Sequence, residues 1–290
     1  MNVMCIDIGT YSIKSIIFET NGRSYTVQKI QEIALAELSN DIYPQTEIHD
    51  KQLAVVKDII GDDFNGKVYA NLPGEYITSR YLTLPVTQKK KVDMMIPFQL
   101  DENLPYSMSN AHYTSQLIKE DESTHALINV TKKEDFDQYF SLLNDYQINI
   151  TALGSELSVV HTLAIDKKIT GPIAIVDIGH ETTKCYIIDN GQVVLNHVNY
   201  NAGASIDEAI ASTYNISLDE AIIYKHQNCF LLTDVQMKTV NEKQQEFARL
   251  MKQTVNPLVL DIKRWLIGFR VKHGKAVTKI YLTGGSSKIN

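Results

Sequence analysis

Two short segments of the sequence place an aspartate, a glycine, a hydroxyl and a lysine at matching positions. The first runs from Asp7 to Lys14 and the second from Asp177 to Lys184, and both begin with the motif Asp-Ile-Gly. A glycine turn between strands lets an oxyanion approach the backbone N–H groups. An aspartate at the strand end suits Mg2+, which keeps several waters and takes few carboxylates. The pattern therefore predicts two phosphate-binding loops, with Mg2+ near Asp7 and Asp177.

A third glycine junction lies near the end of the chain. The apolar run Lys279 to Leu282 is followed by Thr283-Gly284-Gly285-Ser286-Ser287. Glycines at such a junction would let an adenine ring or a ribose lie against bare backbone. Together with Lys14, which could reach a phosphate, these features predict that the two loops clamp a polyphosphate from both sides.

The elements that carry the two loops are repeated. Val3 to Ile8 and Ile13 to Phe18 read as strands that flank Gly9, and Asn21-Gly22 follows them as a hairpin signal. Ile173 to Ile178 and Cys185 to Ile188 flank Gly179 in the same way, and Asn190-Gly191 repeats the turn. This internal duplication predicts two similar α/β halves that face each other.

A block of a different kind separates the two copies. Residues 66–150 contain strand patterns and two helical patterns, and we expect them to form an α+β insertion. Its first helix, from about Gln88 to Asn103, contains Pro97 and should be kinked or interrupted there. Its second should open with a capping box at Thr131 and Glu134.

Several helices are expected after the second loop. Capping boxes at Ser205–Glu208 and Ser217–Glu220 predict two helix starts, and a long helix from about Asn241 to Arg270 contains Pro257 as an expected break. A strand that leads into a glycine loop normally continues into a covering helix. The chain stops at Asn290, so we expect it to be truncated at its C-terminus.

Composition excludes several classes of protein. The 290 residues carry 34 acidic and 28 basic side chains, a net charge of −6, which argues against a nucleic-acid partner. The sequence has no run of 18 apolar residues and no secretory signal at its N-terminus, so we expect no transmembrane segment. Three cysteines without a Cys-x-x-Cys motif fit a reducing cytoplasm.

The order of these motifs resembles the superfamily of actin, Hsp70 and sugar kinases. Within it, the inserted block resembles that of FtsA and, more closely, that of the PilM family of type IV pilus assembly proteins. The residues that carry this resemblance are Leu72-Pro73-Gly74, Arg80, Leu84-Pro85, Leu104-Pro105-Tyr106, Glu156 after Leu153-Gly154, Ala221 to Lys225, and Ile262 to Phe269.

The resemblance implies an actin-like, ribonuclease H-like fold that binds ATP with Mg2+ at the inner face of the cytoplasmic membrane. It also implies a groove for the N-terminal cytoplasmic peptide of a PilN-like membrane protein, and a link to pilus motor ATPases. The first half would comprise residues 1–65 and 151–170, the inserted subdomain residues 66–150, and the second half residues 171–290.

The residues implied for metal are Asp7 and Asp177. Those implied for ATP are Gly9, Thr10, Ser12, Lys14, Gly179, Glu181, Thr182, Lys225, Gly284, Gly285 and Ser286, with Glu156 orienting a water near the γ-phosphate.

Plainer interpretations stay open for single residues. Glu156 could be a solvent-facing helix residue and Lys225 a surface lysine, and His180 stands where the family usually has a small residue. The leading functional hypothesis is an ATP-binding scaffold that hydrolyses ATP slowly at most. Its alternatives are a small-molecule kinase of the same superfamily and a filament-forming protein like FtsA, and self-association stays open.

Overall fold

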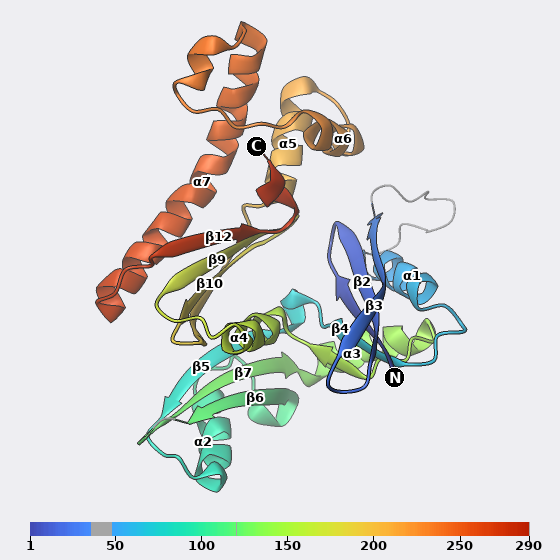
Figure 1. Ribbon diagram of the computed structural model, residues 1–290, viewed down its shortest axis with the longest axis vertical. Helices are drawn as coiled ribbons and strands as arrows, with labels where there is room; N and C mark the ends of the chain where they lie inside the picture. Colours follow the sequence, from blue (N-terminus) through green and yellow to red (C-terminus); the bar gives the residue numbers. More distant parts are fainter. Residues whose placement is uncertain (36–47, 120, 290) are drawn as a thin grey trace. The chain divides into compact units, whose positions relative to one another are not determined.

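The computed structural model describes residues 1–35, 48–119 and 121–289. It divides into two compact units, Met1–Thr162 and Leu163–Asn290, and each unit is described by itself. Figure 1 shows the elements of both units.

A five-stranded sheet forms the centre of the first unit. Its order is β3-β2-β1-β4-β8; β1, β2 and β3 are antiparallel neighbours, whereas β4 pairs in parallel with β1 and with β8. The strands are β1 Asn2–Ile8, β2 Ser12–Thr20, β3 Tyr25–Ala34, β4 Lys67–Asn71 and β8 Ala152–Gly154. A parallel pair needs a long crossover, and helix α1 lies in the chain between β3 and β4.

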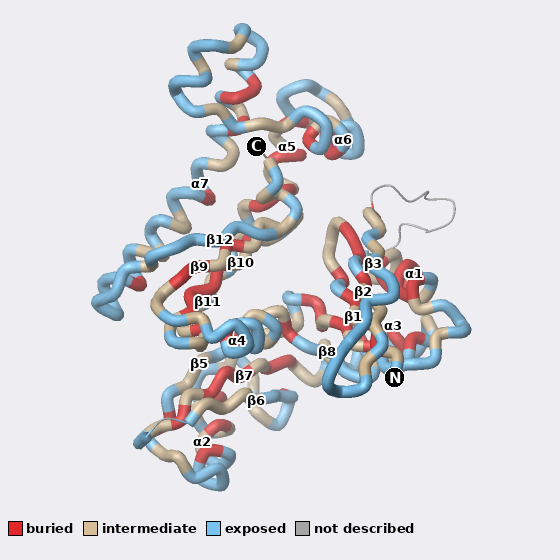
Figure 2. Tube along the Cα trace, viewed as in Figure 1, coloured by how far each residue is buried: buried red, intermediate tan, exposed pale blue. Residues whose placement is uncertain are grey.

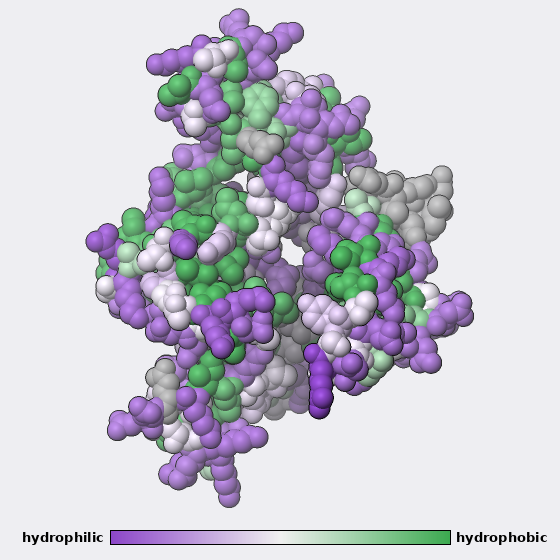
Figure 3. Space-filling model, in the orientation of Figure 1, coloured by the Kyte–Doolittle hydropathy of each residue, from purple (hydrophilic) through white to green (hydrophobic). Residues whose placement is uncertain are grey.

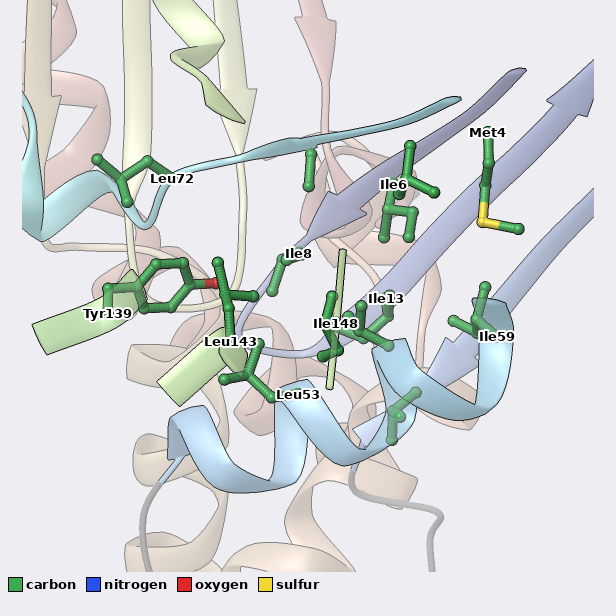
Figure 4. Packing of buried hydrophobic residues seen from close by; sticks show 14 of the residues in the cluster. Met4, Ile6, Ile8, Ile13, Leu53, Ile59, Leu72, Tyr139, Leu143 and Ile148 are labelled. Carbon is green, nitrogen blue, oxygen red and sulfur yellow. The ribbon is translucent and has the colours of Figure 1, made fainter. Parts of the chain in front are cut away.

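Two helices, α1 (Ile48–Ile60) and α3 (Lys133–Asp145), share one core with this sheet. Leu53, Val56 and Ile59 of α1 are buried at helical spacing, as expected for an amphipathic helix. In Figure 4 the side chains of α1 and α3 converge with Ile8 and Ile13 of the sheet. Each fully buried side chain of this kind stabilises the fold by about 1.5–3 kcal/mol.

A smaller antiparallel sheet lies within the predicted insertion. Its order is β5-β7-β6, and helix α2 shares a separate core with it through Leu84, Val92, Ile96 and Ile128. The elements are β5 Thr78–Leu84, α2 Lys89–Asp101, β6 Ala111–Lys119 and β7 Thr124–Lys132. Helix α2 continues through Pro97, so the expected interruption at that residue is wrong.

The predicted block 66–150 also contains elements of the larger sheet. Strand β4 pairs with β1, and Tyr139 and Leu143 of α3 belong to the core around the five-stranded sheet. Only Thr78–Lys132 forms the smaller sheet with α2, preceded by the short helix η2 (Gly74–Tyr76). That the block is an independent subdomain stays a prediction.

The second unit repeats the first four strands of the larger sheet. Its order is β11-β10-β9-β12, with antiparallel pairs except for the parallel pair of β9 and β12. The strands are β9 Ile173–Ile178, β10 Thr183–Asp189, β11 Gln192–Asn199 and β12 Lys279–Thr283. Its helices are α5 Gly203–Tyr214, α6 Leu218–Asn228 and α7 Glu242–His273, and α4 Glu156–Asp166 spans the boundary between the units.

The two sheets agree in pairing register as well as in order. Asp7 lies opposite Lys14 between β1 and β2, and Asp177 lies opposite Lys184 between β9 and β10. The internal duplication predicted from the Asp-Ile-Gly segments is therefore present. In the tube of Figure 2, buried residues lie along β1, β9 and β10, whereas β3 and β12 are largely exposed.

Turn and cap chemistry explain where several elements begin. Asn190 and Gly191 have φ of 52° and 76°, the two positive values that a two-residue hairpin requires. The capping box predicted at Ser217 is present, but those at Thr131 and Ser205 are wrong. Thr131 still pairs within β7, and α5 already begins at Gly203.

Helix α7 is the longest in the described part of the chain, with 32 residues, and it continues through Pro257, so the expected break at that residue is wrong. None of the helices that the structure describes has the length and apolar character needed to cross a bilayer.

Candidate functional site

The first loop is a tight turn that requires glycine. The N–H of Gly9 donates to the carbonyl of Ser12 at 3.2 Å and closes the turn between β1 and β2. A Cβ on Gly9 would lie 2.8 Å from that same oxygen. Any side chain at this position would therefore force the turn to open.

Two side chains distant in sequence hold this loop. The carboxamide of Asn71, at the end of β4, accepts from the Ile8 N–H at 2.6 Å and donates to the Ile8 carbonyl at 3.1 Å. Gln52 of α1, only 3% exposed, donates from Nε2 to the Gly9 carbonyl at 2.9 Å. Both residues escaped the sequence analysis, because no local pattern connects them with the loop.

A row of charged and hydroxyl side chains crosses the sheet beside the first loop. Lys14 Nζ lies 3.5 Å from Asp7 Oδ2 and 4.0 Å from Glu32 Oε1. Ser12 donates to Glu32 Oε1 at 2.9 Å. The side chains of Asp7, Lys14 and Glu32 are each about half exposed, so the ammonium of Lys14 is accessible to an anionic ligand.

The second loop repeats the geometry of the first. The Gly179 N–H donates to the Thr182 carbonyl at 3.0 Å, and a Cβ on Gly179 would lie 2.8 Å from that oxygen. The Gly179 carbonyl accepts from the Gly203 N–H at 3.0 Å and from Ser286 Oγ at 3.1 Å. In each loop the glycine carbonyl is bound by a donor from outside the turn.

The N-terminus of α5 adjoins the second loop. The Ala204 N–H donates to the His180 carbonyl at 2.7 Å. A Cβ on Gly203 would lie 2.6 Å from Ser286 Oγ and 3.0 Å from the Gly179 carbonyl, so a larger residue would displace the helix. The first two N–H groups of α5 are thus bound by carbonyls of the second loop, so Gly203 holds that loop against the helix and is a candidate site residue that the sequence analysis missed.

The third glycine junction, which follows β12, adjoins the end of β9 next to the second loop. Thr283, the last residue of β12, pairs with Asp177, the last but one of β9. Gly284 follows with φ of 87°, and a Cβ there would collide with the Asp177 carboxylate and the Ile178 carbonyl. Within the second unit, the structure thus brings Asp177, Gly179 and Ser286 together around Gly203 and Gly284.

Behind α5 lies a buried cluster of charged groups. Lys225 of α6 donates to Asp207 Oδ2 at 2.5 Å and to the Gly203 carbonyl at 3.1 Å, and His180 Nδ1 lies 3.7 Å from Asp207 Oδ2. Asp207 is fully buried and Lys225 is 8% exposed. Lys225 is therefore not a surface lysine, and Asp207, its partner, was not recognised from the sequence.

Burial sets the pKa directions in this cluster. Desolvation raises the pKa of Asp207, although Lys225 opposes this rise. Desolvation and the charge of Lys225 lower the pKa of His180, so its imidazole is favoured in the neutral form. A neutral ring beside the second loop leaves Lys225 as the cation that balances Asp207.

The remaining predicted residues lie on the loops and on α4. Thr10 and Thr182 are partly exposed, Glu181 faces solvent, and Gly285 opens the short helix η5 (Gly285–Lys288). Glu156 is half-buried in the first turn of α4, after Ser155, whose hydroxyl accepts the Ser158 N–H at 3.0 Å. Roles for these residues stay predictions.

Each loop, within its own unit, offers groups that suit a phosphate with hydrated Mg2+. Among the described residues, no cluster of three or more carboxylate, histidine or cysteine side chains could hold a metal by itself. Mg2+ is commonly held by one or two carboxylates, waters and substrate phosphates. Asp7 and Asp177, each beside a glycine turn without space for a side chain, suit that mode of binding.

Comparison with known structures shows the fold. The chain of a PilM-PilN type IV pilus biogenesis complex matches with a TM-score of 0.74 at 15% identity, over 99% of this chain and 82% of that one. MreB5 of Spiroplasma citri bound to AMPPNP matches with a TM-score of 0.50 at 13% identity, over 100% and 86% of the chains. The ethanolamine utilization protein EutJ from Carboxydothermus hydrogenoformans gives 0.50 at 12% identity, over 100% and 78%. The fold is therefore actin-like, as the resemblance implied.

The family follows from the sequence match. The search of curated proteins found no significant match. A sequence profile of the type IV pilus assembly protein PilM, however, matches residues 5–290, which is nearly the whole chain. The chain belongs to the PilM family of type IV pilus assembly proteins.

Proposed function

We propose that the chain binds ATP with Mg2+ through its two Asp-Ile-Gly loops and the loop at Gly284. The observation that carries this proposal is the shared geometry of the two turns. Gly9 and Gly179 each donate an N–H to the carbonyl three residues later, and neither position has space for a Cβ. Lys14 and the N-terminus of α5 would attract phosphate oxygens. Asp7 and Asp177 would hold Mg2+ through its waters, and the bound metal would offset the phosphate charge.

The residues proposed to contact the adenosine of ATP are Gly284, Gly285 and Ser286. Ser286 already contacts the Gly179 carbonyl, so the junction after β12 adjoins the second loop. Lys225 would act indirectly, because its ammonium is engaged with Asp207 and the Gly203 carbonyl. We infer that it stabilises the start of α5.

We further propose that the protein is a scaffold at the cytoplasmic face of the membrane. A related structure is a complex of PilM with PilN, and family membership extends the expectation of a PilN-like partner to this chain. The partner's short cytoplasmic peptide would dock beside the small sheet. An extended peptide in an apolar groove gains affinity from backbone hydrogen bonds and a few side-chain pockets.

We propose that the protein hydrolyses ATP slowly at most. Two alternative functions, a kinase and a filament-forming protein, predict different measurements. A kinase needs an acceptor hydroxyl near the γ-phosphate and a base within reach, whereas Glu156 is the one candidate found for positioning water. A filament-forming protein like FtsA would polymerise with ATP. Sedimentation with and without Mg-ATP distinguishes a filament from a scaffold.

The first expected result is that Mg-ATP binds, as measured by isothermal titration calorimetry. Asp7→Ala and Asp177→Ala should each weaken binding by about tenfold or more, because each removes a charge-assisted contact to hydrated metal, about 1.4 kcal/mol or above. Asp62→Ala is the matched control, since Asp62 is an exposed carboxylate paired with Lys57 at 3.1 Å and lies outside the loops.

No heat of binding for the wild type at millimolar Mg-ATP would refute the nucleotide proposal. The same preparation serves a phosphate-release assay with candidate sugars and small acids as acceptors. Turnover should stay far below the typical enzyme value of about 10 per second. Rapid phosphate transfer to an acceptor would establish the kinase alternative instead.

The second expected result is that removal of the small sheet abolishes peptide binding but preserves Mg-ATP binding. The deletion should span Thr78–Lys132 rather than the whole predicted block, because β4 and α3 belong to the core of the larger sheet. Thr78 pairs with Val130, so the two ends of the cut are adjacent and a short Gly-Ser linker can join them.

The probe is a synthetic peptide of the cytoplasmic N-terminus of the PilN-like protein, measured by fluorescence anisotropy. Thermal denaturation first establishes that the deletion variant folds cooperatively. Peptide affinity equal to that of the wild type would place the partner site outside the small sheet.

A further inference from the structure

A continuous chain of polar contacts, two hydrogen bonds and one histidine–carboxylate contact, links the first loop with the segment that leads into the small sheet. Gln52 Nε2 donates to the Gly9 carbonyl at 2.9 Å, and Gln52 Oε1 lies 2.9 Å from His49 Nδ1. His49 Nε2 lies 3.2 Å from Glu75 Oε1. Glu75 is the middle residue of η2, which precedes β5 by one residue. The chain therefore connects Gly9 with Glu75 through two side chains of α1.

The donors and acceptors in this chain determine the charge of His49. Only the NH2 group of Gln52 can donate to the Gly9 carbonyl, so the amide oxygen must face His49. His49 Nδ1 must then carry a proton in order to donate to that oxygen. His49 Nε2 lies 3.2 Å from a carboxylate oxygen, whose negative charge would repel the lone pair of an unprotonated nitrogen, so Nε2 carries a proton too. A ring with both nitrogens protonated is an imidazolium.

The surroundings are suited to holding this charge in place. The His49 side chain is 14% exposed, and its ring lies 5.7 Å from Tyr76 and 5.9 Å from Tyr139, centroid to centroid. Two aromatic rings therefore pack near the imidazole. Its neighbour Gln52 is 3% exposed, so the link to Gly9 is shielded from water.

Other titratable groups lie on the described elements around this place. Asp50 of α1 accepts from the Tyr146 hydroxyl of α3 at 3.2 Å, and Glu75 lies on η2. Burial raises the pKa of Tyr139 far above neutrality, and the pKa of Tyr146 is also raised by burial and by Asp50, so both phenols remain neutral. The carboxylate of Glu75 favours a cation, whereas the N-terminus of α1 disfavours one. The contact with Glu75 outweighs the helix dipole because a full negative charge lies only 3.2 Å from the ring nitrogen.

We propose that His49 is a positioning residue, held as an imidazolium between Gln52 and Glu75, that fixes the Gly9 carbonyl and couples the first loop to the entrance of the small sheet. This inference rests on the proposed function, because the first loop is the proposed phosphate site. A neutral His49 carries one proton only, so it loses either its hydrogen bond to Gln52 or its attraction to Glu75. Displacement of the Gly9 carbonyl by a ligand is transmitted along the same contacts to η2.

The charge state is tested without nucleotide. Nitrogen-15 spectra of the histidine rings, assigned by comparison with His49→Gln, should show both nitrogens of His49 protonated at pH 7.5, above the free histidine pKa of about 6.5. The amide resonance of Thr10, which follows the Gly9 carbonyl, should titrate with the same midpoint. Glu75→Gln should lower both midpoints together by about one pH unit. The matched control is His197→Gln, which removes another histidine–carboxylate pair, with Asp261 at 2.7 Å, and should change neither midpoint.

The link to the ligand is tested by calorimetry over the same pH range. Mg-ATP affinity of the wild type should fall about threefold to tenfold as His49 loses its proton. Glu75→Gln should move this fall to lower pH and keep the low-pH affinity within about twofold. A singly protonated His49 at pH 7.5, or equal midpoints in the wild type and Glu75→Gln, would overturn the inference even if ATP binds. Absence of ATP binding refutes the proposed function, and the spectra then decide the charge and the coupling to Thr10 by themselves.

Discussion

Replacing Gly284 with alanine should lower the free energy of unfolding by about 3 kcal/mol, at the upper end for single substitutions. The residue has φ of 87°, where a side chain is strained, and the added Cβ would collide with the Asp177 carboxylate and the Ile178 carbonyl. Because Asp177 is a proposed metal residue, Mg-ATP affinity should also fall by more than tenfold. Urea denaturation and calorimetry measure the two effects.

The neighbouring glycine supplies a control for folding. Gly285 lies outside the positive-φ region, and a Cβ there would meet no atom within 4 Å. Gly285→Ala should therefore unfold at nearly the same urea concentration as the wild type. If both alanine variants proved equally stable, the close approach of Gly284 to β9 would not exist in solution.

Lys225→Met should have the largest effect on stability, a loss of about 3–5 kcal/mol at pH 7, because it leaves the fully buried Asp207 without its cation. A second substitution, Asp207→Asn in the Lys225→Met background, should recover part of the loss by removing the unpaired charge. The matched control is Lys252→Met, which breaks an exposed ion pair with Asp234 and should cost at most about 1 kcal/mol.

The loss in Lys225→Met should shrink as the pH falls. The pKa of Asp207 is already raised by burial, and Lys225 is the main group that lowers it, so the variant raises it further. A carboxyl with a higher pKa in the folded state takes up its proton before the unfolded state does, at about 3.9. Folding of the variant is therefore favoured as the pH drops from 7 toward 5. A stability deficit independent of pH would show that Asp207 is not charged in the variant.

The loops and the duplication could be predicted because their causes are local. A glycine without space for a Cβ must stand at the turn itself, and Asn190-Gly191 carries its two positive φ values within two residues. The repeated pattern predicts two similar halves, whereas the order and register of their strands come from the structure. Gln52 and Asn71 could not be found in this way, because they reach the first loop across 43 and 63 positions of the chain.

Local signals also failed where a tertiary contact competed with them. Thr131 and Glu134 have the spacing of a capping box, yet Thr131 remains paired in β7 and the helix begins without a side-chain cap. Lys225 looks like an ordinary helix lysine until α5 places Asp207 next to it. The charge cluster exists only once α5 and α6 have packed together.

The edge strand β12 of the second unit exposes apolar side chains. Ile280, Tyr281 and Leu282 of β12 are 50–60% exposed, and β12 is an edge strand among the described residues. Figure 3 shows hydrophobic side chains, in green, at the surface around the place where Figure 1 draws β12. Exposed apolar edge strands promote pairing between molecules.

The two matching turns also bear on how such a duplicated chain can diverge over evolutionary time. The need for Gly9 and for Gly179 arises inside each turn, from the carbonyls of Ser12 and Thr182, rather than from any ligand. A copy that had lost its ligand would keep its glycine, since selection for folding alone would retain it. The residues that report on nucleotide binding are therefore the two aspartates and Lys14 beside the turns. In a relative that has lost the ligand, we expect these residues to be replaced while the backbone of the turns stays unchanged.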